Sequence, residues 1–194
     1  MNFVVIYWIT LLILLAIVWT LDIKYNLLRD LSTAIKKPRS FARVQLAWWS
    51  IIILSAIIAA MFRFNEILQL SASTLELLGI SAATTVGARI TDISDIRQNN
   101  IPTRHQDDDG EGFLIDLISN QNGASIHRLQ ALLFNLTFGV WMIINVVNNI
   151  SSSTPIHQII PTIGDNELIL LGISSGTYAV LKIPENKAST HQTK

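Results

Sequence analysis

The 194-residue sequence contains no cysteine. This absence excludes disulfides, cysteine-ligated zinc, iron–sulfur clusters and thiol catalysis, and it leaves the redox compartment undetermined. Charged side chains are also scarce, at 14% of the residues against about 25% in ordinary soluble domains. The 14 acidic and 14 basic residues cancel, so no overall field favours a nucleic-acid partner.

Long apolar runs take the place of the missing charges, and 50% of the residues are hydrophobic. The first run, Phe3–Leu21, is 19 residues long and uncharged. A helix needs ~20 residues to cross the hydrocarbon core of a bilayer. A cleaved signal peptide is the alternative, but the sequence has no basic n-region and no small-x-small cleavage site before Asp22. We therefore interpret this run as a transmembrane helix.

Four further segments are candidate spans: about Val44–Phe62, Ser73–Ile90, Leu129–Val147 and Asn166–Ile183. Small and hydroxyl residues make the second and fourth of these less apolar, and burial in a soluble core is their alternative. Ser73 and Glu76 fit a capping box, which suits a helix that begins at the membrane surface. We expect an all-α transmembrane protein with about five helices.

The basic residues indicate an orientation. With five spans, 13 of the 14 Lys and Arg residues fall on one side, and only Arg63 lies opposite. The positive-inside rule then places the N-terminus outside and the C-terminus in the cytoplasm. The expected order is a transmembrane helix (1–21), a cytoplasmic amphipathic segment (22–39), a two-helix unit (40–90), a cytoplasmic acidic loop (91–124), a second two-helix unit (125–184) and a cytoplasmic tail (185–194).

An internal repeat relates the last four helices. Residues 40–45 match residues 125–130 at a shift of 85, and residues 77–84 match residues 170–177 at a shift of 93. Ser40 and Ser125 suit the N-cap position of each unit's first helix. Both units enter the membrane from the same side, so we expect an N-terminal anchor helix followed by a tandem parallel repeat of two-helix hairpins.

Each unit carries an arginine in its first turn, Arg43 and Arg128. A cation there opposes the helix dipole, so helix stability does not explain these two residues. One interpretation gives them a lipid phosphate or an acidic group as partner. The other makes them ordinary snorkelling arginines that mark the cytoplasmic boundary of the membrane.

The second helix of each unit is rich in glycine and hydroxyl residues. Glycine and alanine stand four apart, which lets membrane helices pack closely. The hydroxyls either bond within this packing or line a narrow wet path. The pore-lining or helix-packing candidates are Gly79, Ser81, Ala83, Thr84, Gly87, Gly172, Ser174, Gly176 and Thr177.

The first helix of the second unit carries a polar stripe. Gln130, Thr137 and Asn145 fall near one face, and polar groups in lipid should face protein or water. We therefore expect this stripe to face the bundle or a cavity.

Two classes of activity find little support in the spans. No ionisable residue lies deep inside any of them, which disfavours proton-coupled transport. No Ser, His and Asp set has a recognisable catalytic spacing, so we expect no enzyme, and we predict no metal site or cofactor.

The cytoplasmic segments have patterns of their own. Residues 21–35 place apolar residues on one face and basic residues on the other, which predicts an interfacial amphipathic helix. The acidic run 107–111 does not fit an EF-hand, because His105 and Asp116 stand where Asp and Glu belong. We expect a solvated acidic loop there, followed by a short surface helix at residues 113–118.

The repeated Ser-x-x-Arg-x-Gln entry and the Leu-Gly-Ile-Ser-x-x-Thr helices resemble an uncharacterised family of small bacterial multi-pass membrane proteins. The likeness covers about residues 40–185. It implies the bacterial inner membrane as location and transfers no activity or site.

Two functions fit these features. The first is a homo-oligomeric channel or pore-forming protein with the Gly/Ser/Thr helices nearest the path. The alternative is a structural or accessory subunit of a larger membrane complex. The expected partners are the lipid bilayer and either further copies of the chain or that complex.

Overall fold

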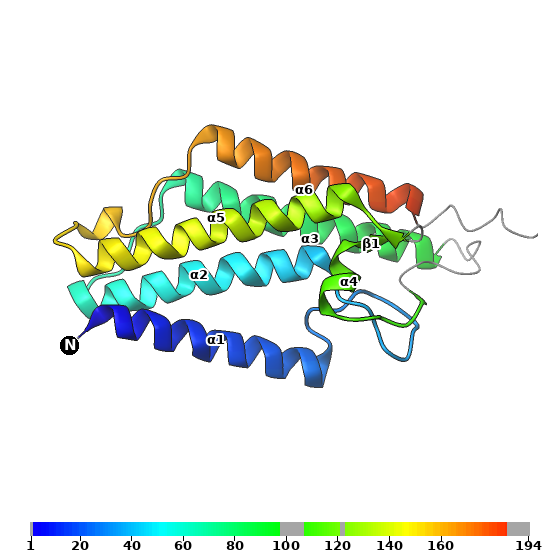
Figure 1. Ribbon diagram of the computed structural model, residues 1–194, viewed down its shortest axis with the longest axis horizontal. Helices are drawn as coiled ribbons and strands as arrows, with labels where there is room; N and C mark the ends of the chain where they lie inside the picture. Colours follow the sequence, from blue (N-terminus) through cyan, green and yellow to red (C-terminus); the bar gives the residue numbers. More distant parts are fainter. Residues whose placement is uncertain (1, 98–106, 121–122, 186–194) are drawn as a thin grey trace, which may run out of the picture.

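Five long helices lie side by side in the computed structural model, which describes residues 2–97, 107–120 and 123–185 (Figure 1). They are α1 (Phe3–Tyr25), α2 (Phe41–Phe64), α3 (Ala72–Arg97), α5 (Ile126–Ser151) and α6 (Asp165–Glu185). Short elements between them are α4 (Phe113–Ile118), a hairpin of β1 (Ser119–Asn120) and β2 (Gly123–Ala124), and a 3-10 turn (Ile156–Gln158). The expected all-α class is confirmed, because 74% of the residues are helical.

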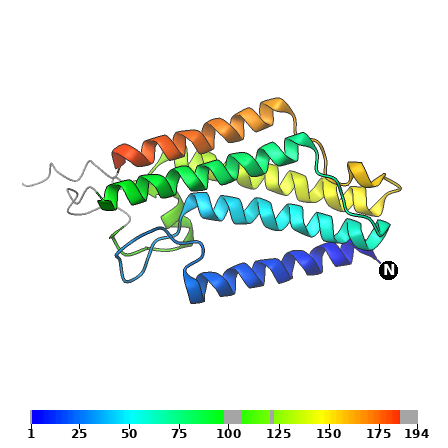
Figure 2. The same ribbon diagram turned by 180° about the vertical axis from the view of Figure 1, so that it is seen from behind.

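Three of the long helices, α1, α2 and α5, are long and apolar enough to cross a membrane. The other two, α3 and α6, run alongside them in both views (Figures 1 and 2). The shortest, α6, has 21 residues, and at 1.5 Å per residue it is about as long as the ~30 Å hydrocarbon core is thick. Helix α3 ends at Arg97, beyond the predicted end at Ile90. Most of the predicted tail, 185–194, lies outside the described residues.

Helices α2 and α5 begin where the two serines predicted. Ser40 and Ser125 are their N-cap residues and have extended backbone, but neither side chain caps its helix. The Ser125 hydroxyl instead lies 2.8 Å from Nε2 of His127. The two serines mark the helix starts correctly, and the capping bond expected of them is absent.

The capping box predicted at the start of α3 is wrong. The helix begins at Ala72, and the Oγ of the preceding Ser71 accepts the N–H of Thr74 at 3.3 Å. The Ser73 hydroxyl does not cap its own helix. It accepts the N–H of Ile163, in the loop before α6, at 3.2 Å. The Ser73 oxygen thus accepts a buried N–H from a distant segment instead of one from the first turn of α3.

The amphipathic helix predicted over residues 21–35 is also wrong. Helix α1 ends at Tyr25, because Asn26 adopts the left-handed conformation with φ of 56°. Asparagine tolerates this conformation better than most residues and closes the helix with its own N–H on the Asp22 carbonyl. The chain from there to Pro38 contains no helix.

The main hydrophobic core joins all five long helices. Its fully buried side chains include Tyr7 of α1, Trp49 of α2, Leu77 of α3, Met142 of α5 and Leu171 of α6. A smaller cluster lies at the end where α1 finishes, and there the rings of Phe41 and Tyr178 have centroids 5.0 Å apart.

Candidate functional site

A cap of mostly irregular chain covers the end of the bundle where α1 finishes. It consists of residues 26–39 and residues 107–118, which include α4. Asp107 Oδ1 accepts the N–H of Thr33 at 2.8 Å, and Asp109 Oδ1 accepts the N–H of Lys36 at 2.9 Å. Both carboxylates bind backbone N–H groups that have no helical partner, and Asp109 remains exposed at the surface, as expected of a solvated acidic loop.

Asp22 of α1 anchors this cap to the bundle. Its side chain is 1% exposed, and its Oδ1 accepts the N–H of Leu28 at 3.0 Å. The Nε atoms of Arg29 and Arg39 lie 3.7 and 3.5 Å from its two oxygens. Two guanidinium groups thus neutralise a carboxylate that is withdrawn from water, as a buried charge requires.

Arg39 connects the anchor to α4. Its guanidinium carbon lies 5.9 Å from the ring centroid of Trp19 and 5.2 Å from that of Phe113, distances typical of cation–π contacts. Its backbone N–H donates to Asp116 Oδ2 at 3.1 Å. The short helix predicted at residues 113–118 is present as α4, and Leu117 fixes it by being fully buried.

A second buried ion cluster lies in the same end of the molecule. Lys182 Nζ in the last turn of α6 lies 3.0 Å from Asp92 of α3 and 3.3 Å from Asp30 of the cap. The Lys182 side chain is 2% exposed. The positive-inside argument counts this lysine on the cytoplasmic side, and its carboxylate partners, 90 and 152 positions away, leave no local signal in the sequence.

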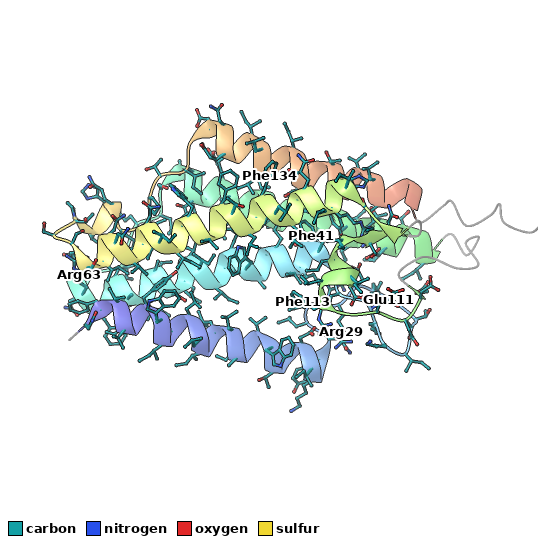
Figure 3. The ribbon with its side chains drawn as sticks, viewed as in Figure 1. Arg29, Phe41, Arg63, Glu111, Phe113 and Phe134 are labelled. Carbon is teal, nitrogen blue, oxygen red and sulfur yellow. The ribbon has the colours of Figure 1, made fainter. Side chains whose placement is uncertain are left out.

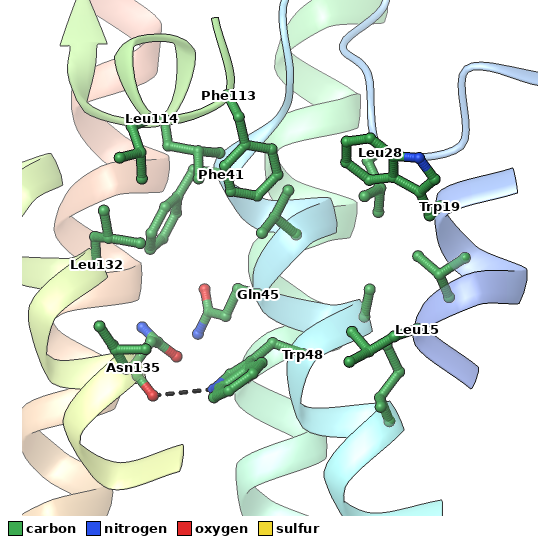
Figure 4. Close-up of a pocket in the computed structure, with 16 residues that line it drawn as sticks. Leu15, Trp19, Leu28, Phe41, Gln45, Trp48, Phe113, Leu114, Leu132 and Asn135 are labelled. Atoms are coloured by element: carbon green, nitrogen blue, oxygen red, sulfur yellow. Dashed lines mark hydrogen bonds between the residues drawn. The ribbon is translucent and has the colours of Figure 1, made fainter. Parts of the chain in front are cut away.

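Below the cap, α1 diverges from the bundle and leaves a lateral groove. Tyr7 and Leu11 in its first half are buried in the core, whereas the second half stands apart from α2 (Figure 1). The groove has a volume of about 370 Å³. Its lining comes from four helices and the cap (Figure 4). The residues are Leu15, Val18 and Trp19 of α1, Leu28 of the cap, Phe41, Val44, Gln45, Ala47, Trp48 and Ile51 of α2, Phe113, Leu114 and Leu117 of α4, and Leu132, Asn135 and Leu136 of α5.

The floor of this groove carries a few polar atoms. Gln45 Nε2 donates to Ser175 Oγ of α6 at 2.8 Å, and Gln45 Oε1 has no hydrogen-bond partner among the described residues. Asn135 receives two indole N–H bonds, from Trp48 to its carbonyl and from Trp49 to its side-chain oxygen. Gln45 is thus the one groove-lining residue described here whose buried side chain retains an unused polar atom.

The Gly/Ser/Thr candidates divide between packing and exposed positions. Buried Ser81 and Thr84 donate to carbonyls one turn back, those of Leu77 and Ile80. A Cβ added at Gly172 would lie 3.7 Å from Ile80 of α3, so that glycine lies in the α3–α6 contact.

The remaining candidates lie as follows: Gly87 is half-buried near Ala179, Ser174 is buried, Thr177 is half-buried, and Gly79, Ala83 and Gly176 are exposed. At Gly79 and Gly176 an added Cβ would meet no other atom of the described chain within 4 Å.

The polar stripe does not face the interior of a single chain, contrary to the expectation. Gln130 and Thr137 are exposed, and half-buried Asn145 donates to the carbonyl of Trp141 on its own helix. Two other polar residues of α5, Arg128 and Asn135, are buried, and the sequence pattern did not indicate Asn135. The buried face is marked instead by Ala131, Asn135, Gly139, Met142, Val146 and Ile150, a spacing of three and four residues that signals one helical face.

The two first-turn arginines have partners within the chain. Arg43 donates to the Leu27 carbonyl at 3.2 Å. Arg128 is buried and lies 5.1 Å from the ring centroid of Tyr178. Both side chains therefore help to hold the cap end of the bundle.

The chemistry of this end is that of an apolar groove under a rigid charged cap. In the described parts of the chain, no group of three His, Asp or Glu side chains is placed to hold a metal ion. No family model, curated protein or solved structure matches this sequence.

Proposed function

We propose that the protein is a multi-pass integral membrane protein with five spans. Support comes from the three apolar helices and from α3 and α6, which run beside them over comparable lengths. The outer face of α1 exposes large apolar side chains such as Leu12, Ile13 and Ile23 by more than half of their surface. A continuous apolar face of this kind suits lipid rather than water.

The proposed orientation places the cap in the cytoplasm and the N-terminus outside. Arg29 and Glu111 belong to the cap end, whereas Arg63 lies at the far end of the bundle (Figure 3). The imbalance of Lys and Arg between these ends supports this orientation under the positive-inside rule. The bacterial inner membrane, and the descent of residues 40–90 and 125–184 from one two-helix unit, are parts of the same proposal.

Within the membrane we assign the chain the role of a structural or accessory subunit. The main support for this role is that polar side chains of the chain form hydrogen bonds between its own helices. Gln45 joins α2 to α6, and Trp49 joins α2 to Asn135 of α5. Near the far end, the Arg63 guanidinium of α2 donates to the carbonyls of Asn149 and Ile150 on α5.

The hydroxyls of α3 follow the same logic. Thr85 Oγ1 lies within hydrogen-bond distance of two carbonyls, that of Ala42 on α2 and that of Ser81 one turn back. A hydroxyl has only one proton to donate, and at Thr85 that proton is taken by backbone carbonyls rather than offered to a water path. Rigid packing of this kind fits a subunit that presents fixed surfaces to larger partners.

Purification from native membranes tests this role. Tagged protein expressed at its natural level, extracted in mild detergent, should carry a partner protein in a fixed ratio. The Gly79→Leu variant should reduce that ratio, since Gly79 is exposed and touches nothing else in the described chain. Recovery of the chain only with copies of itself would overturn the assignment.

A homo-oligomeric channel is the second candidate. The specific observation in its favour is the small, open surface at Gly79, Ala83 and Gly176, where a second copy has room to approach closely. Purified protein in liposomes should then conduct ions, and Gly176→Leu should alter the conductance. An absence of flux under varied voltage, calcium and tension excludes this candidate.

A further inference from the structure

We propose that the lateral groove holds one acyl chain of a phospholipid from the cytoplasmic leaflet, as a lipid that stays bound while its neighbours exchange. This inference rests on the proposed membrane location and cap-inside orientation. Its occupant is defined by the dimensions, the polarity and the charge of the groove.

The groove has the length of one leaflet. Its lining on α2 runs from Phe41, the first residue of the helix, to Ile51. Ten residues of helix rise about 15 Å, which is half of the ~30 Å hydrocarbon core. The side chains of Phe113, Leu114 and Leu117, which belong to the cap, close the end of the groove near the start of α2. A chain that enters from the cytoplasmic leaflet therefore fits without crossing the midplane.

The groove is held open by the fold. Asp22 ties the end of α1 to Leu28, Arg29 and Arg39 of the cap, which fixes the position of the second half of α1 beside the groove. An unfilled apolar space loses dispersion contacts on every wall, and water has almost nothing to bond to there. In a bilayer the nearest filler is a lipid chain, and the indole rings of Trp19 and Trp48 offer it flat walls.

Gln45 provides the one polar contact for that lipid. It lies four residues inside α2, about 6 Å below the helix start, close to the depth at which ester groups meet the hydrocarbon. Ser175 Oγ can donate or accept, so the amide can turn and present its NH₂ to the groove. The Nε2 atom then donates to an ester carbonyl of the bound lipid.

Headgroup charge should contribute little to this binding. Arg29 and Arg39 of the cap already face Asp22, and Arg39 also faces Asp116, whereas the Arg43 guanidinium of α2 donates to the Leu27 carbonyl. The docked carboxylates of Asp107 and Asp109 offset the remaining basic residues of the cap. Zwitterionic and anionic phospholipids with the same chains should therefore be retained equally.

Lipid retention tests the proposal. The full chain is reconstituted into vesicles of dioleoyl phosphatidylcholine, alone or mixed equally with dioleoyl phosphatidylglycerol. It is then extracted and washed in detergent, and native mass spectrometry counts the lipids that remain bound to each chain. Wild type should keep about one phospholipid per chain, without headgroup preference. Ala47→Phe fills the groove and should lower the number of retained lipids roughly tenfold, whereas the matched change Ala82→Phe at an exposed position of α3 should not.

Further variants keep the test informative. Leu132→Trp fills the groove from α5 if Ala47→Phe fails to fold, and the Gln45→Leu, Ser175→Ala double variant should lower retention while leaving the thermal midpoint nearly unchanged. Equal retention by wild type and the folded filled variants overturns the proposal, and so does a lipid-free wild type or a dimer without lipid. A chain that alkaline carbonate strips from membranes refutes the membrane assignment instead, so the two failures are distinguishable.

Discussion

Gln45 of α2 and Ser175 of α6 are hydrogen-bonded at 2.8 Å although they stand 130 positions apart. Both belong to the repeated motifs, Gln45 to the entry of the first unit and Ser175 to the second helix of the other. Under the proposed division into two repeat units, the bond therefore crosses from one unit to the other. By the two shifts of the repeat, its counterpart would join Gln130 to Ala82, and alanine has no hydroxyl to offer.

Ser175→Ala should lower stability more than the Gln45→Leu, Ser175→Ala double variant does. The single change leaves both polar atoms of a buried amide without a partner, which costs about 1–3 kcal/mol. Replacing both partners by apolar groups is nearly neutral. Thermal midpoints of the two variants and of Gln45→Leu in one detergent complete the cycle. Additive effects would show that the two side chains are not coupled.

Removing the Lys182 ammonium should loosen the cap. Lys182→Met removes a buried cation that lies 3.0 Å from Asp92 and 3.3 Å from Asp30, and loss of one partner from a buried ion pair costs about 3–5 kcal/mol. Limited proteolysis should then cut between residues 26 and 39. Lys24→Met, on the exposed last turn of α1, is the matched control. Resistance equal to wild type in both variants would contradict a structural role for this ion cluster.

The sequence allows the long helices to be predicted because their signals are local. Ser40 and Ser125 stand immediately before α2 and α5, and apolar runs of sufficient length follow them. The cap was not predictable in the same way. Asp22, Asp30 and Asp109 look like solvated charges in the sequence, and their burial or docking depends on partners that the fold brings together.

The groove and its floor show the same limit. Asn135 is one of several polar residues on α5, and only the three-and-four spacing of its buried neighbours separates it from exposed Gln130 and Thr137. The divergence of α1, which creates the groove, is accompanied by the contacts of buried Asp22 with Leu28, Arg29 and Arg39. Asp22 is the one acidic residue of α1, but its sequence position alone does not reveal these partners.

The absence of cysteine makes the five-span topology directly testable. Single cysteines at exposed Glu66 and Ser153 should react with a membrane-impermeant maleimide on spheroplasts, whereas one at exposed Thr33 should react only in inverted vesicles. If α3 does not cross, Ser153 and Glu66 lie on opposite sides, so this pair separates five spans from three. Labelling of Thr33→Cys from outside would reverse the proposed orientation.

Two glycines inside long helices should respond in opposite ways to alanine. A Cβ at Gly139 of α5 would lie 2.6 Å from Cε2 of Trp48, whose indole N–H donates to the Asn135 carbonyl. Gly139→Ala should therefore displace that ring, reshape the groove and destabilise the protein by about 1–3 kcal/mol. Thermal unfolding and Trp fluorescence report both effects.

Gly176 of α6 is the control, because a Cβ there meets nothing within 4 Å. Alanine is favoured over glycine inside a helix by about 1 kcal/mol, so Gly176→Ala should leave an isolated chain equally or more stable. The homo-oligomeric channel predicts the opposite effect on stability, because its copies would pack closely against each other at Gly176 and an added methyl group would separate them. A loss of stability together with a smaller native mass in Gly176→Ala would favour that channel over the accessory subunit proposed above.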